Sequence, residues 1–250
     1  MKNYIGITGY KTPQEVDIAS SLYQKHKLPD NLTAMIGILS SHDLVQSPTI
    51  ESGRFPATNM IPAIARAAPS WTLPMIHYQA KSSQDMVTDL TTMLSGIYDS
   101  CKAVQLNMTW PDPSAVRKLK STFPDLDIVL PVIPGSLRNL QPTQIADKMS
   151  EYAGSVSYFL YDPSEGAGLE FDVEKAITVM QAVQEKLPGV NIGAAGGLDQ
   201  HNVFGKVTGI KKHIDDFFID AEGRLMPNAT LDMKLCEGYI SEAIRGFKER

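Results

Sequence analysis

Residues 156–172 read V-S-Y-F-L-Y-D-P-S-E-G-A-G-L-E-F-D, and residues 190–203 read V-N-I-G-A-A-G-G-L-D-Q-H-N-V. In both stretches an apolar run passes through glycines into the start of a helical pattern. The first run ends at Asp162, and the glycines that follow the two runs are Gly166, Gly168, Gly196 and Gly197. Glycines at a strand-to-helix turn permit positive φ and let backbone N–H groups approach a ligand. Because the start of the next helix favours an anion such as phosphate, we predict that both stretches form one side of an active-site mouth.

Outward from these stretches, the whole chain alternates apolar runs with amphipathic helical patterns. The apolar runs cover residues 4–8, 32–39, 73–79, 103–108, 126–133, 156–162, 191–195 and 214–220. Strands that are apolar throughout and alternate with helices indicate a parallel sheet covered by helices. Eight such units in 250 residues predict a single-domain α/β protein, a (β/α)8 TIM barrel over residues 1–250. An open doubly wound sheet is the main alternative, but the first unit lacks its G-x-G-x-x-G pattern.

The loops and the last helices complete this prediction. Residues 40–58 are polar and separate the second strand from a helix expected over residues 59–67. A connection of about 18 residues is far longer than the usual two to six, and such loops are commonly functional or mobile. We expect the seventh helix over residues 200–207 and the closing helix over residues 231–247.

The composition, with 43% hydrophobic and 20% charged residues, is that of an ordinary globular protein. A formal net charge of −5 and the lack of a basic run argue against a nucleic-acid partner. We expect neither a membrane span nor secretion, because no run of about 18 apolar residues and no signal-peptide pattern is present. Cys101 and Cys236 are the only cysteines. They show no metal-binding spacing, which predicts a reduced, cytoplasmic protein without a bound metal or cofactor.

Position selects the candidate site residues, because the active site of a TIM barrel lies at the C-terminal ends of the strands. Those expected to bind substrate are Arg54, His77, Gln105 and Asn107. Asp162 is the candidate general acid or base for a sugar carbon or oxygen, although Asp-Pro-Ser is also typical of a turn. The guanidinium of Arg54 can bind a carboxylate or phosphate of the substrate through two hydrogen bonds. The alternative interpretation is an arginine of a solvated loop. His77 lies in an apolar strand, where a buried interior histidine is the simpler interpretation.

The last two loops of a TIM barrel frequently bind phosphate. The glycines expected to contribute are Gly166, Gly168, Gly196 and Gly197. A tight turn without a ligand is the alternative interpretation of the Gly196-Gly197 pair. The end of the eighth strand offers Asp220, Glu222 and Arg224. Glu222 would repel a phosphate unless it points away, and Arg224 could offset that charge and bind the phosphate itself.

Four segments together resemble the phosphoribosylanthranilate isomerase family. Residues 103–107, A-V-Q-L-N, resemble the V-Q-L-H-G of that family's fourth strand. Residues 162–172 are similar to its D-S…G-G-T-G-x-x-F-D segment, and residues 195–203 are similar to its A-G-G-L-x-P-E-N-V. Residues 52–55, S-G-R-F, resemble its S-x-R-x in the second loop. The similarity follows the strand order and is most specific in the sixth and seventh units.

The resemblance implies a TIM barrel that converts a phosphorylated aminoaldose into an aminoketose. It gives Asp162 the role of the acid and Arg54 that of the arginine that binds the anthranilate carboxylate. The backbone around Gly168, Gly197 and Gly223 takes the place of the family's phosphate site.

The chain departs from this family at several positions. Ile5 occupies the place of the cysteine base in the family's K-x-C-G, and an isoleucine cannot accept a proton. Asn107 replaces the histidine of V-Q-L-H, and Ala221-Glu222 replaces a serine pair. Loss of a general base typically costs about 10² to 10⁴ in rate. We therefore expect a divergent member in which another residue of the mouth, such as His77, acts as the base.

These observations predict an isomerase or related acid/base enzyme that acts on a small phosphorylated sugar-type metabolite without a cofactor. A barrel that retains the phospho-ligand pocket without catalysis is one alternative, and a barrel aldolase or lyase is another. The aldolase would need a Schiff-base lysine, for which Lys81 after the third strand is a candidate. Neither a nucleic acid nor a membrane is an expected partner, and a homodimer is compatible with the sequence.

Overall fold

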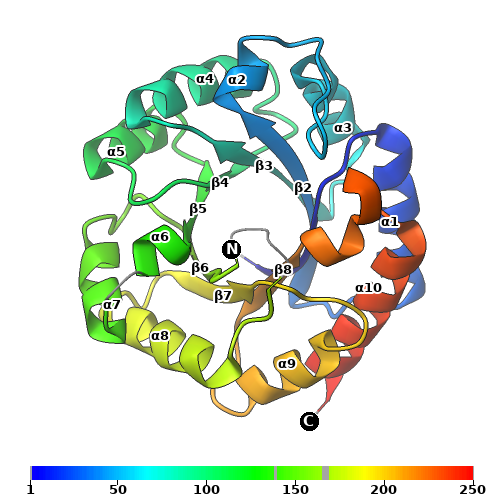
Figure 1. Cartoon of the computed structure of the whole chain (residues 1–250), viewed down its shortest axis with the longest axis vertical. Coiled ribbons are helices and arrows are strands. Elements are labelled where there is room, and N and C mark those ends of the chain that lie inside the picture. Colours follow the sequence, from blue (N-terminus) through cyan, green and yellow to red (C-terminus); the bar gives the residue numbers. More distant parts are fainter. Residues whose placement is uncertain (1, 138–139, 165–168, 250) are drawn as a thin grey trace.

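The computed structural model describes residues 2–137, 140–164 and 169–249. Its parallel strands form a closed barrel in which each strand neighbours the next in the chain and β8 pairs with β1 (Figure 1). The strands are β1 (Asn3–Thr8), β2 (Leu32–Ser41), β3 (Thr72–Gln79), β4 (Ala103–Leu106), β5 (Asp127–Val132), β6 (Tyr158–Tyr161), β7 (Asn191–Ala195) and β8 (Phe218–Ala221). This closed parallel barrel confirms the predicted (β/α)8 fold and excludes the open doubly wound sheet.

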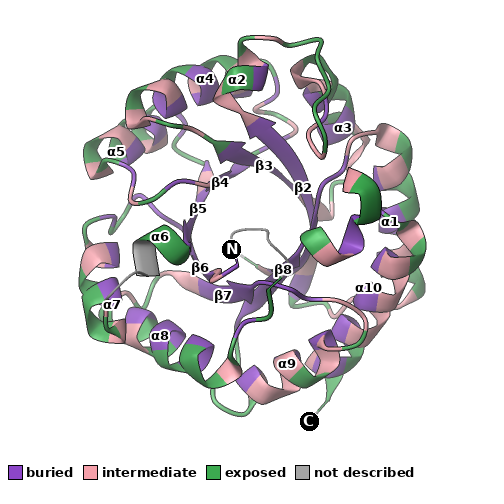
Figure 2. Ribbon diagram, viewed as in Figure 1, coloured by how far each residue is buried: buried purple, intermediate pink, exposed green. Residues whose placement is uncertain are grey.

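The strands bury both of their faces (Figure 2). On the outer face, strand side chains join the surrounding helices in one large apolar cluster. Inside the barrel a second cluster consists of strand side chains, most of them from the N-terminal halves of the strands: Tyr4, Met35, Met75, Ala103, Val129, Tyr158, Leu160, Ala195 and Phe218. The rings of Tyr4 and Phe218 lie 4.3 Å apart between centroids, and Tyr158 packs against both. We call this second cluster the apolar plug, and it closes one end of the barrel.

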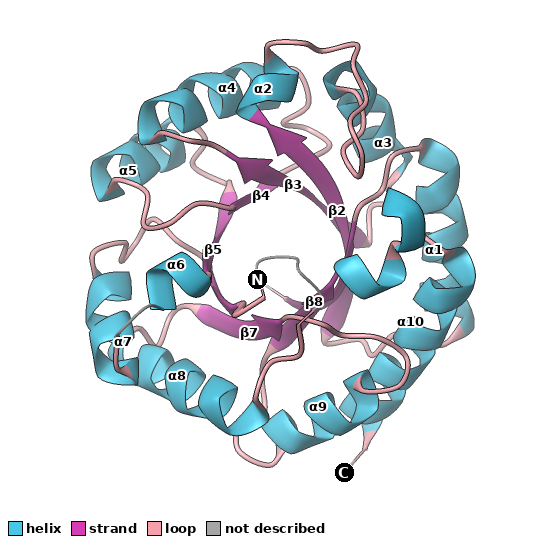
Figure 3. Ribbon diagram, in the orientation of Figure 1, coloured by secondary structure: helices cyan, strands magenta, loops and turns pink. Residues whose placement is uncertain are grey.

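Helices surround the barrel as an outer layer (Figure 3). The longer ones are α1 (Pro13–Lys25), α3 (Ile61–Ala67), α4 (Ser83–Ser95), α5 (Pro113–Thr122), α7 (Pro142–Ser150), α8 (Val173–Lys186), α9 (Val203–Lys211) and α10 (Met233–Lys248). Short helical segments in the loops are α2 (His42–Val45), α6 (Pro134–Leu137), η1 (Thr58–Met60), η2 (Gly223–Leu225) and η3 (Pro227–Ala229). Across the described residues, no helix has both the length and the apolar character that crossing a membrane requires.

Local sequence signals set where helices begin. The Thr12 hydroxyl accepts the N–H of Glu15 and the Glu15 carboxylate accepts the N–H of Thr12, while Pro13 fills the first helical position of α1. The carboxylates of Asp172 and Asp232 accept backbone N–H groups at the starts of α8 and α10. Each such cap satisfies donors that the helix leaves unpaired and contributes about 1 kcal/mol.

The seventh helix differs from the sequence prediction. The sequence predicts residues 200–207, whereas the helix, α9 (Val203–Lys211), begins and ends a few residues later. The reason is that Asp199 accepts the backbone N–H groups of His201 and Asn202, which makes a separate turn before the helix. The apolar pattern correctly predicts a helix here, but residues 200–202 belong to the turn before it and not to the helix.

The eighth strand is also shorter than predicted, whereas the other strands agree to within two residues at each end. It covers Phe218–Ala221 rather than residues 214–220. The exposed pair Asp215-Asp216 bends the chain before it enters the sheet. The long polar loop after β2 contains α2 and an isolated bridge between Ser52 and Phe55.

Candidate active site

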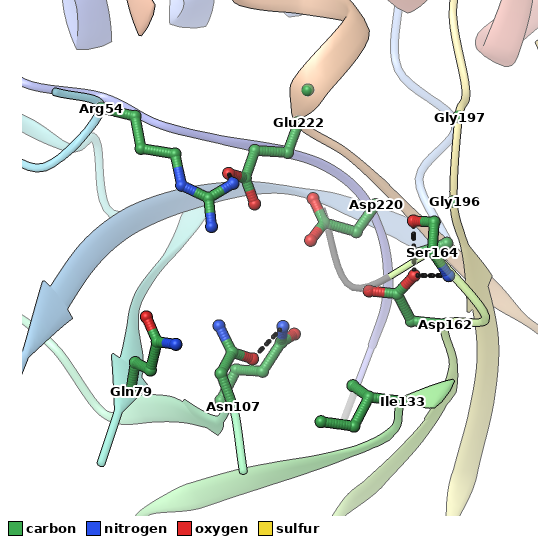
Figure 4. Close-up of a pocket in the computed structure, with 13 residues that line it drawn as sticks. Arg54, Gln79, Asn107, Ile133, Asp162, Ser164, Gly196, Gly197, Asp220 and Glu222 are labelled. Carbon is green, nitrogen blue, oxygen red and sulfur yellow. Dashed lines mark hydrogen bonds and ion pairs between the residues drawn. The ribbon is translucent and has the colours of Figure 1, made fainter. Parts of the chain in front are cut away.

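A pocket with a cavity volume of about 70 Å³ opens at the C-terminal ends of the strands (Figure 4). Nine residues that the sequence singled out line it: Arg54, Gln105, Asn107, Asp162, Gly196, Gly197, Asp220, Glu222 and Gly223. The predicted Gly166 and Gly168 lie outside the described residues. Since one water needs about 10–15 Å³ of such space, the cavity holds on the order of five non-hydrogen atoms. That is the size of one phosphate or of one small polar group.

Asp162 follows β6 directly and points into the pocket (Figure 4). Its Oδ1 atom accepts the backbone N–H of Ser164 at 3.0 Å and the Ser164 hydroxyl at 2.8 Å. The Asp-Pro-Ser segment is thus a turn in which the side chain bonds its own backbone. This turn fixes the orientation of a carboxyl group that also lines the pocket, so the two interpretations of Asp162 are compatible.

Arg54 and Glu222 form an ion pair across the pocket rim. Arg54 comes from the loop after β2, where its guanidinium also lies 5.6 Å from the centre of the Phe55 ring. Burial, and to a smaller extent the charge of Asp162, raise the pKa of Glu222 to about 7, although the charge of Arg54 lowers it. The cation beside Glu222 is therefore Arg54 rather than Arg224, contrary to the sequence expectation.

Arg224 interacts with two carboxylates near the start of α9. Its Nη1 atom donates to Asp199 Oδ2 at 2.8 Å and to Glu170 Oε1 at 3.0 Å. The hydrogen bond to Asp199 raises the pKa of Arg224, and the one to Glu170 adds to this. Asp199 Oδ1 meanwhile accepts the N–H of His201 at 2.7 Å. The helix start that the sequence suggested as an anion site is thus occupied by a carboxylate, and Arg224 is not among the pocket-lining residues.

A buried polar group lies at the floor of the pocket. Asp220, which is 5% exposed, accepts hydrogen bonds from Thr8 Oγ1 at 3.1 Å on both carboxylate oxygens. Burial raises its pKa well above the usual range, and the charge of Glu222 raises it further. His77 Nδ1 lies 3.3 Å from Thr8 Oγ1. Burial and the charge of Arg54 lower the pKa of His77 to about 3, so His77 is a neutral interior residue and is not part of the lining.

Gln105 and Asn107 form an amide pair on the pocket wall. Gln105 Nε2 donates to Asn107 Oδ1 at 2.9 Å. The Oε1 atom of Gln105 is buried and has no hydrogen-bond partner. Buried amide oxygens normally find a donor, so this atom is available to a ligand that supplies one.

The side chain of Ile5 lies outside the barrel interior. A Cβ atom at Gly6 would lie 2.9 Å from Asp220 Oδ1, so Gly6 faces inward, as does Thr8, which bonds Asp220. Strand alternation therefore turns Ile5 outward, where it packs in the outer cluster and its carbonyl oxygen accepts the Tyr23 hydroxyl at 2.9 Å. Ile5 matches the family's cysteine in sequence, but the residue of β1 nearest the pocket is Thr8.

Gly196 and Gly197 form the bend after β7. Their φ angles of +117° and +58° lie in the left-handed region, which glycine adopts without strain. A Cβ atom at Gly196 would lie 3.2 Å from both the Leu169 carbonyl oxygen and Ser164 Oγ. The turn and its packing account for these glycines, and both also border the pocket.

Gln79 and Ser164 line the pocket as well, although the sequence did not single them out. Two signals could have found them. Gln79 follows His77 at the strand period of two and therefore faces the same side. Ser164 stands two residues after Asp162, the spacing of a side-chain-to-backbone turn. Within the part of the chain that the structure describes, no group of three or more His, Cys, Asp or Glu residues is arranged to hold a metal ion.

Comparison with known proteins supports the barrel fold. No protein-family model and no curated protein sequence matches the chain. Among solved structures, it is similar to N-(5'-phosphoribosyl)anthranilate isomerase from Pyrococcus furiosus, at 15% identity and a TM-score of 0.63 over 96% of this chain and 98% of that chain. The phosphoribosyl anthranilate isomerase from Thermus thermophilus matches at 13% identity and a TM-score of 0.66, over 97% and 98%. The tryptophan synthase alpha subunit from Legionella pneumophila matches at 10% identity and a TM-score of 0.61, over 98% and 92%. These identities show a shared fold, and it is the fold that the sequence resemblance implied.

Proposed function

We propose that the rim pocket is the active site of an isomerase, or of a related acid/base enzyme, that acts on a small phosphorylated sugar-type substrate. The observation that carries this proposal is the entry of Asp162 and Glu222 into one pocket from the ends of β6 and β8 (Figure 4). With a pKa of about 7, Glu222 is present in both protonation states at neutral pH. That is the condition under which a general acid or base is most effective.

In this proposal Glu222 is the base and Asp162 is the acid. Ser164 orients Asp162 through two hydrogen bonds to one carboxylate oxygen. Arg54 holds Glu222 in place and favours its ionised form. Glu222 thereby takes the role for which the sequence suggested His77, which is neutral and lies outside the lining.

The proton transfers balance as in an aldose–ketose isomerisation. The Glu222 carboxylate removes the proton from the carbon next to the substrate carbonyl. Asp162 gives a proton to the carbonyl oxygen, which yields an enediol. Asp162 then takes a proton from the other hydroxyl oxygen, and Glu222 returns its proton to the former carbonyl carbon.

The backbone at Gly197 and Gly223 is the proposed phosphate site. Both glycines border the pocket, and backbone N–H groups at such bends can hold a phosphoryl oxygen. The fold shared with phosphoribosylanthranilate isomerases and the similar sequence segments support this class of substrate. Arg224 contributes less than the sequence suggested, because Asp199 and Glu170 already bind it.

Turnover assays test the proposal. Phosphoribosylanthranilate and a panel of aldose and ketose phosphates are incubated with the wild type, Asp162→Asn and Glu222→Gln, and products are followed by NMR. The matched control is Asp125→Asn, which removes an exposed carboxylate 3.8 Å from Lys102. We expect both pocket variants to lose about 10²- to 10⁴-fold in rate and the control to lose none. Undiminished turnover in Asp162→Asn would remove Asp162 from the mechanism.

A binding protein without catalysis is the second candidate. The observation that favours it is the Arg54–Glu222 ion pair, which engages the proposed base. Thermal stabilisation by a sugar phosphate, with no turnover across the panel, would select this alternative. A Schiff-base aldolase has less support, because Lys81 is exposed, pairs with Asp43 at 3.4 Å and does not line the pocket.

A further inference from the structure

Among the residues that the structure describes, the lining of the rim pocket contains more carboxyl groups than basic groups. The described lining contains the carboxyl groups of Asp162, Asp220 and Glu222 and one guanidinium, that of Arg54. Arg54 is bound to Glu222. The carboxyl group of Asp220 at the floor of the pocket is bound by the Thr8 hydroxyl and not by Arg54.

Asp220 is the buried member of this group, and its hydrogen-bond donors are neutral. They are the Thr8 hydroxyl, at 3.1 Å, and the backbone of Ala221. Among the described residues its only basic neighbour within ion-pair distance is His77, 4.0 Å away. His77 stays uncharged because burial lowers its pKa to about 3. A buried carboxyl group without a cation must either stay protonated or receive a cation from outside.

Gln105, on the wall of the pocket, provides an independent observation. Its side chain is 4% exposed, and its Oε1 atom is buried without a hydrogen-bond partner. Its amide nitrogen is engaged by Asn107. Figure 4 shows Asn107 across the cavity from Asp220, with Asp162 to one side beside Ser164. The floor, at Asp220, and the wall, at Gln105, thus both offer acceptors to a ligand that carries N–H donors.

We infer that the ligand of this pocket carries a protonated amine, which binds between the Asp220 carboxyl group and the Gln105 amide oxygen. An ammonium group brings three N–H donors and a positive charge, so it has a donor for each acceptor and supplies the positive charge that Asp220 lacks. A cavity of about 70 Å³ accommodates an ammonium group and the carbon that bears it. A phosphate at the same place would meet the carboxyl groups instead. The ligand class is therefore a polyhydroxylated amine such as an amino sugar.

This inference rests on the proposed function and deepens it, because it names a group that the substrate of the same site carries. The phosphoryl group proposed for the glycine bends would lie at the rim, and the ammonium group would lie at the floor. A zwitterionic ligand also offsets the repulsion between a phosphoryl group and Glu222. Binding can be measured without turnover, so the inference can fail while the isomerase proposal stands, and the reverse.

Calorimetric titration at neutral pH tests the inference with three matched sugars: D-glucosamine, D-glucose and N-acetyl-D-glucosamine. The first has an ammonium group where the second has a hydroxyl and the third a neutral amide. Because a hydrogen bond to a charged group is about 1–2 kcal/mol better than one to a neutral group, we expect glucosamine to bind about tenfold more tightly than the other two. Gln105→Leu and Asp220→Asn should remove this preference, and Asp125→Asn should retain it.

Thermal unfolding of each variant verifies that it is folded. Should Asp220→Asn not fold, Gln105→Leu decides, since it removes the second acceptor without touching the buried carboxyl group. Equal affinity of the wild type for the three sugars, including no detectable binding of any, would overturn the inference. So would a preference for glucosamine that persists in the folded pocket variants.

Discussion

The two ends of the barrel interior are built from the same strands but differ in chemistry. In β8 the inward residues are Phe218, then Asp220, and then Glu222 just beyond the strand. Phe218 packs against Tyr4 and Tyr158 in the apolar plug, whereas the next two inward residues are carboxylic acids of the pocket. The contrast teaches that strand alternation selects which residues face inward, and that residue identity decides whether an inward position supports stability or chemistry.

Burial also has opposite energetic effects at the two ends of the barrel. At the plug, burial of apolar area is favourable at about 25 cal/mol per Å². At the pocket, burial opposes the charged form of the acids, and it raises the pKa of Glu222 to about 7 although Arg54 attracts the ionised form. The pocket therefore costs stability that the plug and the outer cluster must supply.

The largest expected effect lies at the pocket. Asp162→Asn should lower kcat/KM by about 10²- to 10⁴-fold, while the free energy of unfolding changes by less than about 1 kcal/mol. Steady-state kinetics and urea unfolding measure the two quantities on the same sample. A parallel loss of stability would assign Asp162 to the fold rather than to the chemistry.

The next largest effect lies at the plug, where we expect a substitution to lower stability. Phe218→Ala should lower the free energy of unfolding by about 3–5 kcal/mol, because it leaves a cavity among fully buried rings. Urea unfolding measures this loss. Ile18→Ala on α1, where the side chain is 47% exposed, is the control and should change stability by less than about 0.5 kcal/mol. Similar values for the two variants would contradict the description of the plug.

A third effect concerns pH. The folded pKa of Glu222 is raised from 4.5 to about 7, so between these values the folded chain binds more protons than the unfolded chain. Stability attributable to this group is present below about pH 4.5 and is lost as the pH rises through about 7. Glu222→Gln should reduce this loss by about 3 kcal/mol. Urea unfolding between pH 4.5 and 8 compares the two proteins, and parallel curves would show that Glu222 titrates normally.

The smallest expected effect is the change in stability when Gln105 in the pocket is replaced. Gln105→Leu replaces a buried amide that has an unpartnered oxygen with an apolar side chain of similar size. Removing an unsatisfied polar atom is close to neutral for stability, so we expect a change within about 1 kcal/mol. The same substitution should abolish the preference for an amine ligand. A large loss of stability would mean that the bond to Asn107 serves the fold.

The fold was predictable from the sequence because its signals are local. Apolar runs alternate with capped helices, and Thr12 and Asp172 mark helix starts through hydrogen bonds to residues three positions away. The errors in α9 and β8 arose where polar turn residues adjoin an apolar pattern. Such boundaries depend on which side chain takes the backbone donors, as Asp199 does.

The site was predictable in part for the same reason. Residues at the ends of strands reach one rim in any such barrel, so Asp162 and Gln105 could be named. The pairing of Arg54 with Glu222, 168 positions apart in the chain, depends on how two loops meet and leaves no local signal. Sequence similarity aligned Ile5 with the family's cysteine, but it does not tell which residues of β1 face the barrel interior. The outward orientation of Ile5 could therefore not be predicted.

The most direct test of the central claim, that buried and incompletely compensated carboxyl groups form a reactive pocket, is a carboxyl-carbon NMR titration of the protein. Glu222→Gln and Asp220→Asn assign the two signals. The structure predicts that Glu222 titrates near pH 7 and that Asp220 keeps its proton well above the usual range. Titration of both groups near pH 4, as for solvated carboxylates, would contradict the account.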